Sequence, residues 1–274
     1  LRLGGARSKR AAPEGQKQYY GAQTSRGKCS MAARPTYSPT PTPESEYRSA
    51  GRAARPRDAA TLIIVRSDGR HPRILMGQRS AGHKFMPNKF VFPGGKVDAG
   101  DGRLQPPHDL HPDVMARLTR GCSPTRARAL AMAAIRETYE ETGLVLGEPD
   151  TPTLKTRSPH WREFLQYDVN PRLDSLHFIA RAITPPYRKR RFDARFFMGD
   201  ADLIQGGVHE APEGSGELLG IHWVTLKDAH ALELPNITRV VLAEVERRLR
   251  EGHQPHDKGP FIYFRHGKPV TDEI

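Results

Sequence analysis

The stretch Ala129-Leu-Ala-Met-Ala-Ala-Ile-Arg-Glu-Thr-Tyr-Glu-Glu-Thr-Gly143 decides the fold of this chain of 274 residues. Its alanines and leucine favour an α-helix. Ser123 can accept a hydrogen bond from the first free N–H groups of such a helix, and Pro124 suits the first helical position. Gly143 can adopt the left-handed conformation that ends many helices. We therefore predict one helix that begins near Pro124 and stops at Gly143.

Three acids of this helix share one face. Glu137, Glu140 and Glu141 are three and four residues apart, so their side chains are neighbours on the helix surface. Their carboxylates repel one another, and the single guanidinium of Arg136 compensates only part of that charge. A hard divalent cation such as Mg²⁺ or Mn²⁺ would neutralise them, because it takes oxygen ligands. A solvated acidic face without a metal is the alternative that this helix alone leaves open.

The segment Phe92-Pro-Gly-Gly-Lys-Val-Asp-Ala-Gly-Asp101 precedes the helix and is typical of a strand that ends in a tight glycine turn. Together the two stretches resemble the Nudix box, in which a Gly and an acid are followed by Arg-Glu-apolar-any-Glu-Glu-any-Gly-apolar. Thr138 stands where that pattern has an aliphatic residue, and Asp101 stands where it usually has Glu. The matching residues are Gly95, Asp101, Arg136, Glu137, Glu140, Glu141, Gly143 and Leu144.

The spacer between the two halves of the box is longer than the usual spacer of the Nudix family. Residues 102–127 are rich in Pro, His and Arg, and we interpret them as an inserted loop that rejoins the helix at Ser123. An interrupted box of this kind resembles one branch of the family. The sequence leaves open whether the loop covers a substrate or extends into solvent.

Charge divides the chain into a tail and a body. Residues 1–57 contain 12 basic and 3 acidic residues, whereas residues 58–274 contain 31 and 28. The tail lacks hydrophobic periodicity, so we predict that residues 1–57 are disordered and that residues 58–274 form the folded domain. Because the first methionine is Met31, we also expect that residues 1–30 are not translated in the native protein; an Arg-rich leader peptide is the alternative.

The composition also limits the partners and the location. The folded body has little excess positive charge, so we expect no nucleic-acid partner for it. No apolar run is long enough for a membrane helix, and we expect no membrane partner. Two cysteines fit a reducing compartment, which favours a cytoplasmic location. A homodimer is a possibility that the sequence leaves open.

Hydrophobic patterning predicts further elements around the acidic helix. Residues 59–66 and 73–79 are expected to form a hairpin, followed by short strands at 89–92 and 144–146 and a short helix near 161–165. Strands are expected at 176–184, 190–198, 217–225 and 260–265, with helices starting at 226 and spanning 236–251. This order indicates an α/β protein. The resemblance implies a Nudix-type α/β/α sandwich with a mixed central sheet.

The resemblance further implies a metal-dependent hydrolase that cleaves a nucleoside diphosphate joined to another group. By that analogy Glu137 and Glu141 are direct metal ligands, Glu140 is a ligand or a base, and Arg136 orients these carboxylates. The carbonyl of Gly95 is a further candidate ligand. The general base differs among branches of the family, and Glu217, beside a flexible glycine-rich segment, is our candidate for it. Weaker candidates are His209 and Glu210.

The substrate follows from a looser resemblance to the coenzyme A diphosphatases, based on Arg79-Ser80, Phe92-Pro-Gly-Gly95 and the interrupted box. It implies coenzyme A or acyl-coenzyme A as the substrate. ADP-ribose or a nucleotide sugar is the alternative, and a non-catalytic Nudix-like regulator that binds nucleotides is the alternative from another class. A capped RNA end is a third option. The candidate substrate-binding residues are Arg79, Gly94, Arg190 and Arg191, together with Arg188 and Lys189.

Overall fold

The structure is a computed structural model that describes residues 47, 51–82, 86–149, 154–207, 216 and 218–274. Contacts divide the chain into two units, residues 1–34 and 35–274, and every described residue belongs to the second unit. Most of the tail for which we predict disorder lies outside the described residues. The candidate bases Glu217, His209 and Glu210 do as well. No helix in the described part of the chain has the length and hydropathy to span a membrane.

The described residues form one large mixed sheet and one small antiparallel ribbon. The large sheet has the order β11-β10-β7-β8-β1-β2-β3, with β4 added beside β1 and β9 beside β2. β1 runs parallel to β8, and β10 runs parallel to β7, while the remaining pairs are antiparallel. The strands of the large sheet are β1 (Arg57–Arg66), β2 (Arg73–Arg79), β3 (Phe90–Val91), β4 (Gly94–Lys96), β7 (His177–Ile183), β8 (Phe192–Asp200), β9 (Leu218–Thr225), β10 (Pro260–Arg265) and β11 (Lys268–Glu273). The ribbon consists of β5 (Glu148–Pro149) and β6 (Val169–Asn170).

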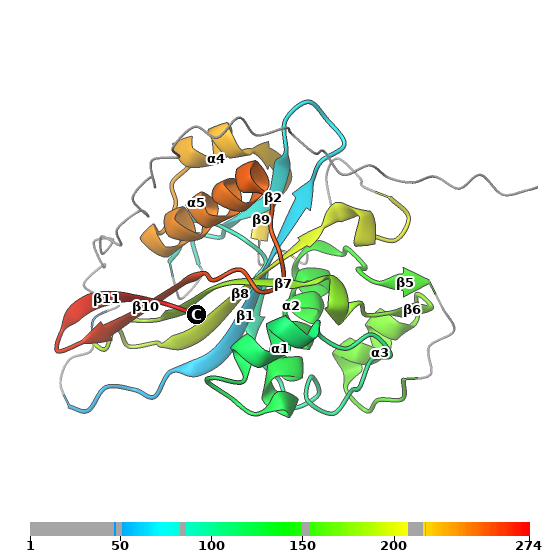
Figure 1. Cartoon of the computed structure of the whole chain (residues 1–274), viewed down its shortest axis with the longest axis horizontal. Helices are drawn as coiled ribbons and strands as arrows, with labels where there is room; N and C mark the ends of the chain where they lie inside the picture. The colour runs from blue at the N-terminus through cyan, green and yellow to red at the C-terminus, as the bar shows by residue number, and fades with distance from the viewer. Residues whose placement is uncertain (1–46, 48–50, 83–85, 150–153, 208–215, 217) are drawn as a thin grey trace, which may run out of the picture. The chain divides into compact units, whose positions relative to one another are not determined.

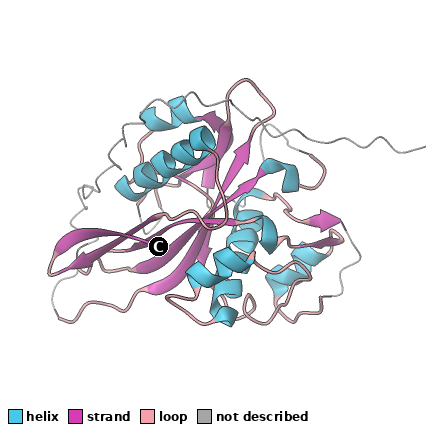
Figure 2. Ribbon diagram, in the orientation of Figure 1, coloured by secondary structure: helices cyan, strands magenta, loops and turns pink. Residues whose placement is uncertain are grey.

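Helices cover both faces of this sheet, as predicted for an α/β/α sandwich (Figures 1 and 2). One group, α1 to α3, lies on one side, and α4 and α5 lie on the other. Their bounds are α1 (Pro112–Leu118), α2 (Pro124–Thr142), α3 (Pro159–Leu165), α4 (Leu226–Ala231) and α5 (Asn236–Glu251), with short 3₁₀ helices η2 (Leu173–Ser175) and η3 (Ala201–Leu203).

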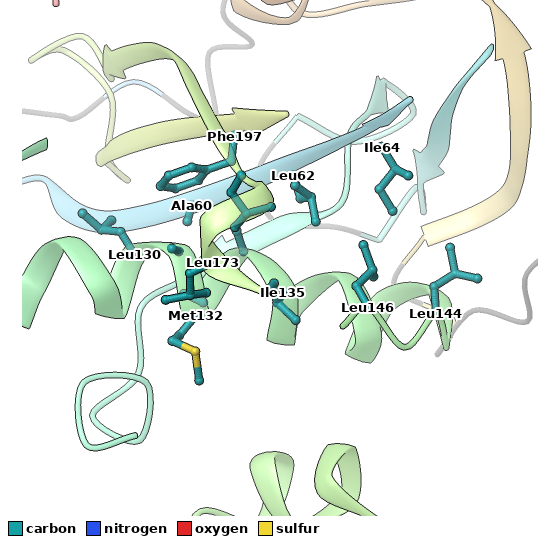
Figure 3. Packing of buried hydrophobic residues seen from close by; sticks show 14 of the residues in the cluster. Ala60, Leu62, Ile64, Leu130, Met132, Ile135, Leu144, Leu146, Leu173 and Phe197 are labelled. Carbon is teal, nitrogen blue, oxygen red and sulfur yellow. The ribbon is translucent and has the colours of Figure 1, made fainter. Parts of the chain in front are cut away.

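The central strand β1 explains why two layers of helices are needed. Successive side chains of a strand point to opposite faces, so a strand that is apolar throughout must be covered on both sides. Leu62 and Ile64 pack into the cluster that includes the apolar side of α2 (Figure 3). Ile63 and Val65 pack into the second cluster, with α5. All four side chains are buried, and this position of β1 fixes α2 against the centre of the sheet.

The ends of α2 follow the predicted local chemistry. The Ser123 hydroxyl accepts a hydrogen bond of 3.2 Å from the Arg126 N–H, and Pro124 occupies the first helical position. Gly143 ends the helix in the left-handed conformation with φ of 72°. The helix therefore begins and ends where the sequence predicts.

The structure differs from the predictions in three places near the site. Residues 112–118, which we expect to be part of an inserted loop, form α1, and Val114 and Leu118 are buried in the core. The glycine turn at Gly94 and Gly95 is a strand, because its backbone pairs with β1. Residues 144–146 form only an isolated bridge, between Leu146 and Ile204, instead of a strand. The C-terminal strand β11 was not predicted at all.

Candidate active site

A cavity of about 1030 Å³ lies beside the C-terminal half of α2. The three predicted glutamates, Glu137, Glu140 and Glu141, all line it, together with the backbone of Gly94 and Gly95. Helix α2 supplies the acids, and β4, which is paired to β1, supplies the glycines. The sheet thus joins the two halves of the sequence motif, although about forty residues separate them.

Arg136 is the centre of the polar network under this cavity. Its side chain is only 2% exposed. Nη1 donates to Glu137 at 2.9 Å and to both oxygens of Glu140 at 3.1 Å. Nε and Nη2 donate to the two oxygens of Asp101 at 2.9 and 3.1 Å, and Nη2 also donates to the Lys96 carbonyl at 2.8 Å. All three nitrogens of the Arg136 guanidinium therefore donate hydrogen bonds to these carboxylates, and one of them also donates to a backbone carbonyl.

The two glycines allow the backbone to approach the acids closely. The Gly94 N–H donates to Glu141 Oε2 at 2.8 Å. A Cβ at Gly94 would collide with the backbone of Ala60 and Thr61 on β1, and a Cβ at Gly95 would collide with the Glu137 carboxylate. A larger residue at position 94 would push β4 away from β1, and one at position 95 would displace the Glu137 carboxylate. The need for glycine at both positions therefore arises from packing as well as from the site.

Asp101, Glu137 and Glu140 all accept hydrogen bonds from the single cation Arg136. The pKa values of Glu137 and Arg136 reflect this excess of negative charge. Burial raises the pKa of Glu137 to about 7; Arg136 opposes the rise, while Glu140 and Asp101 reinforce it. Burial alone would lower the pKa of Arg136, but its hydrogen bonds and charge interactions with Asp101, Glu137 and Glu140 raise it. The site consequently favours any additional positive charge, either a proton on Glu137 or a bound cation.

The residues present fit a divalent cation in charge and in ligand type. Glu137, Glu140 and Glu141 offer carboxylate oxygens, the donors that Mg²⁺ and Mn²⁺ prefer. In the described part of the chain, however, no three His, Cys, Asp or Glu side chains already stand together as a metal-binding group. Glu137 and Glu140 accept from Arg136, and Glu141 accepts from Gly94, so each carboxylate has a protein donor.

Two residues of the site were missed by the sequence analysis or were assigned no role. Asp101 is completely buried and accepts hydrogen bonds from Arg136, from the Trp161 indole at 2.8 Å and from the Asp98 N–H at 2.7 Å. Although Asp101 is shorter than the Glu that is usual at this position, its carboxylate holds Arg136 in place. His160, at the start of α3, lies with Nδ1 2.9 Å from Glu140 Oε1. A predicted helix near 161–165 was the only signal for this contact, and nothing in the pattern related that helix to α2.

The predicted substrate-binding cations separate into two groups. Arg79, Arg188 and Arg190 line the cavity that holds the glutamates. Arg191 does not line it: Arg191 donates to the carbonyls of Thr184 at 3.0 Å and Ala54 at 2.7 Å, and so holds the backbone of the adjoining segments together. Lys189 lines a neighbouring cavity instead.

Sequence comparison finds relatives that bear on this site. The chain is 30% identical over 152 residues to nudix hydrolase 7 of Caenorhabditis elegans, a match that covers 52% of this chain and 43% of the relative. It is 30% identical over 177 residues to the acyl-coenzyme A diphosphatase NUDT19 of Homo sapiens, covering 46% and 47%. The chain thus spans about half the length of these curated relatives. No family-level sequence model matches the chain.

The fold points to the same class. The chain resembles the crystal structure of a NUDIX hydrolase from Alicyclobacillus acidocaldarius, with a TM-score of 0.51 and 25% identity, over 69% of this chain and 90% of that one. A mixed sheet between helices, with glutamates and an arginine on one central helix, has the architecture of that Nudix fold. The chain is therefore similar to Nudix hydrolases both in sequence and in fold.

Proposed function

We propose that the protein hydrolyses the diphosphate linkage of a nucleoside diphosphate joined to another group, and that it needs a divalent cation to do so. One observation carries this proposal. A single cavity contains an excess of carboxylates at the end of α2 together with the cations Arg79, Arg188 and Arg190. A diphosphate and its metal ion need both kinds of group, because the metal requires oxygen ligands and the phosphates require positive charge.

In this proposal Glu137 and Glu141 hold the cation, and Glu140 either assists them or accepts a proton from the attacking water. When bound, Mg²⁺ or Mn²⁺ would polarise the phosphoryl oxygens and acidify that water. Arg136, held by Asp101, keeps Glu137 and Glu140 in place. Glu217 remains our candidate for the general base, and the Gly95 carbonyl remains a candidate ligand.

Coenzyme A or an acyl-coenzyme A is the substrate we favour. One sequence relative is named an acyl-coenzyme A diphosphatase, and the long spacer in this chain's motif resembles that branch. Arg79, Gly94 and Arg190 line the cavity and would contact the diphosphate or the nucleotide. We further propose a cytoplasmic location, because the sequence contains only two cysteines.

The test is a substrate survey with purified protein in Mg²⁺ or Mn²⁺. Coenzyme A, ADP-ribose and NADH are supplied separately, and the products are separated by chromatography. Release of adenosine 3′,5′-bisphosphate from coenzyme A supports the favoured substrate. Cleavage of ADP-ribose alone would support the alternative substrate class, and nucleotide binding without any cleavage would contradict the proposed hydrolysis.

A further inference from the structure

A second cavity, of about 650 Å³, is lined mostly by basic residues. Among the described residues, its lining contains no acidic side chain. Its other members are Ala54, Pro56 and Phe192, and its basic members are Arg55, Arg57, Lys96, Lys189, Arg190 and Arg191. We call it the basic cavity. Six cations around one hollow create a strongly positive local potential.

The basic cavity adjoins the cavity that holds the glutamates. Lys96, Arg190 and Phe192 line both of them. Lys96 is held close to the acids, because Arg136 Nη2 donates to its carbonyl at 2.8 Å. Parallel pairing of Arg57 with Phe192 brings the first residues of β1 beside those of β8. One small molecule could therefore place one part beside the glutamates and another part in the basic cavity.

Five of the six cations of the basic cavity have no acidic partner among the described residues. Among the described residues, no ion pair involves the side chains of Arg55, Arg57, Lys96, Lys189 or Arg190. A third cavity shares Arg55, Arg57 and Lys96 with the basic cavity, but acids line it as well. There Asp58 pairs with Arg126 at 2.7 Å and with Arg195 at 2.6 Å.

This difference has a direct electrostatic consequence. Like charges that share a hollow repel, and an anion bound among them removes that repulsion. Guanidinium and ammonium groups bind phosphate oxygens through charge-assisted hydrogen bonds. Arg126 and Arg195, which pair with Asp58 in the third cavity, have no comparable need for a ligand.

We propose that the basic cavity binds a phosphate monoester that the substrate carries in addition to its diphosphate. This inference rests on the proposed function, because it assigns one end of the substrate to the glutamates and another end to the basic cavity. Arg55, Arg57, Lys96 and Lys189 then determine specificity. They favour a nucleotide with a 3′- or 2′-phosphate over the same nucleotide without it. The sequence alone did not single out the first three.

Matched substrate pairs test this proposal. Coenzyme A is compared with 3′-dephospho-coenzyme A, and NADPH with NADH, by measuring kcat/KM for each. We expect the wild-type protein to prefer the phosphorylated member of one pair by about tenfold or more. The pair that shows the preference tells which ribose position carries the phosphate. In the double variant Arg55→Ala/Lys189→Ala that preference should fall about tenfold, since two of the cations are removed.

The control is Lys227→Ala. Lys227 is an exposed cation on α4 that lines none of the three cavities. The Lys227→Ala variant should keep the wild-type preference for the phosphorylated substrate. This control separates an effect of the basic cavity from an effect of net charge. A wild-type protein that cleaves both members of each pair equally well would overturn the inference while the proposed function stands. A preference that persists in the double variant would also overturn it.

Calorimetry covers the case in which the protein cleaves none of these substrates and the proposed function fails. Adenosine 3′,5′-bisphosphate, adenosine 2′,5′-bisphosphate and AMP are each titrated into the wild-type protein and the double variant. Tighter binding of either bisphosphate than of AMP, lost in the double variant, supports the basic cavity as a phosphate site. Equal binding of all three nucleotides by the wild-type protein contradicts it.

Discussion

Two buried arginines, Arg136 on α2 and Arg248 on α5, have similar hydrogen-bond partners but a different balance of charge around them. Arg136 on α2 is 2% exposed and donates to Asp101, Glu137 and Glu140. Arg248 on α5 is 0% exposed and donates to Glu244 at 2.7 Å and to two carbonyls, those of Asp257 and Lys258. Each guanidinium thus pairs with a glutamate four residues away on its own helix.

The balance of charge differs between the two clusters. Acids exceed cations around Arg136, and this excess raises the pKa of the arginine despite its burial. Cations exceed acids around Arg248. Burial, together with the charge of Arg248, lowers the pKa of neighbouring Arg117 to about 10. The first cluster lines the large cavity beside α2. An excess of acid open to a cavity indicates a place for a cation, whereas the second cluster ties α5 to residues 254–258.

The largest effect should come from Glu141→Gln. Glutamine keeps the shape and can still accept the hydrogen bond from Gly94, but it removes one of the charges that hold the cation. We expect kcat to fall about 1,000-fold, equivalent to about 4 kcal/mol, with little change in the unfolding temperature. Steady-state hydrolysis and a thermal melt measure the two quantities. The matched control Glu246→Gln removes an acid from the exposed side of α5 and should keep full activity.

Arg136→Met should have the next largest effect. It leaves Asp101 buried and without its guanidinium partner, and it leaves Glu137 and Glu140 without Nη1. Removing one member of a buried ion pair typically costs about 3–5 kcal/mol. Urea denaturation should show a loss of that size in the free energy of unfolding. A loss below about 1 kcal/mol would mean that the acids do not depend on Arg136.

The same substitution in the other cluster, Arg248→Met, should cost less. Glu244 keeps a second partner, since Arg247 donates to it at 2.8 and 3.0 Å. The substitution also removes the repulsion between Arg248 and Arg117. We expect a loss of about 1–2 kcal/mol in urea denaturation, with unchanged kcat. If Arg136→Met and Arg248→Met lost the same free energy of unfolding, the proposed difference between the two arginine clusters would be contradicted.

The smallest expected effect is the change in stability with pH that is caused by His177, which lies near Arg248. Burial, together with the charges of His253 and Arg248, lowers the pKa of His177 to about 4. A lowered pKa favours the neutral ring in the folded state, so its stabilisation is complete above pH 6.5 and is lost as the pH falls toward 4. The variant His177→Phe should lose less stability over this range than the wild type, in melts recorded from pH 7 to 4. If the stability of the wild type and of His177→Phe fell equally from pH 7 to 4, the predicted role of His177 would be contradicted.

The sequence predicted those features that depend on local chemistry. Ser123, Pro124 and Gly143 bound α2 as expected, and the glutamates share a face because helical geometry requires it. The strands of the hairpin and the long helix 236–251 were also confirmed, because their apolar patterns are regular.

Features that depend on distant pairing could not be predicted from a local pattern. Asp101 becomes the anchor of Arg136 only when the segment before α1 folds beneath α3 and meets Trp161. The basic cavity forms because β1 and β8 pair in parallel although their first residues, Arg57 and Phe192, are 135 positions apart in the sequence. Strand β11 is largely exposed and polar, so its pattern carried no signal.

The most direct test of the account is a calorimetric titration of Mn²⁺ into metal-free protein. Wild-type protein and the control Glu246→Gln should bind Mn²⁺ with the same affinity. The double variant Glu137→Gln/Glu141→Gln should bind it at least about 100-fold more weakly, because two anionic ligands are lost. Equal affinity in the wild type and the double variant would contradict the claim that the glutamates of α2 hold a divalent cation.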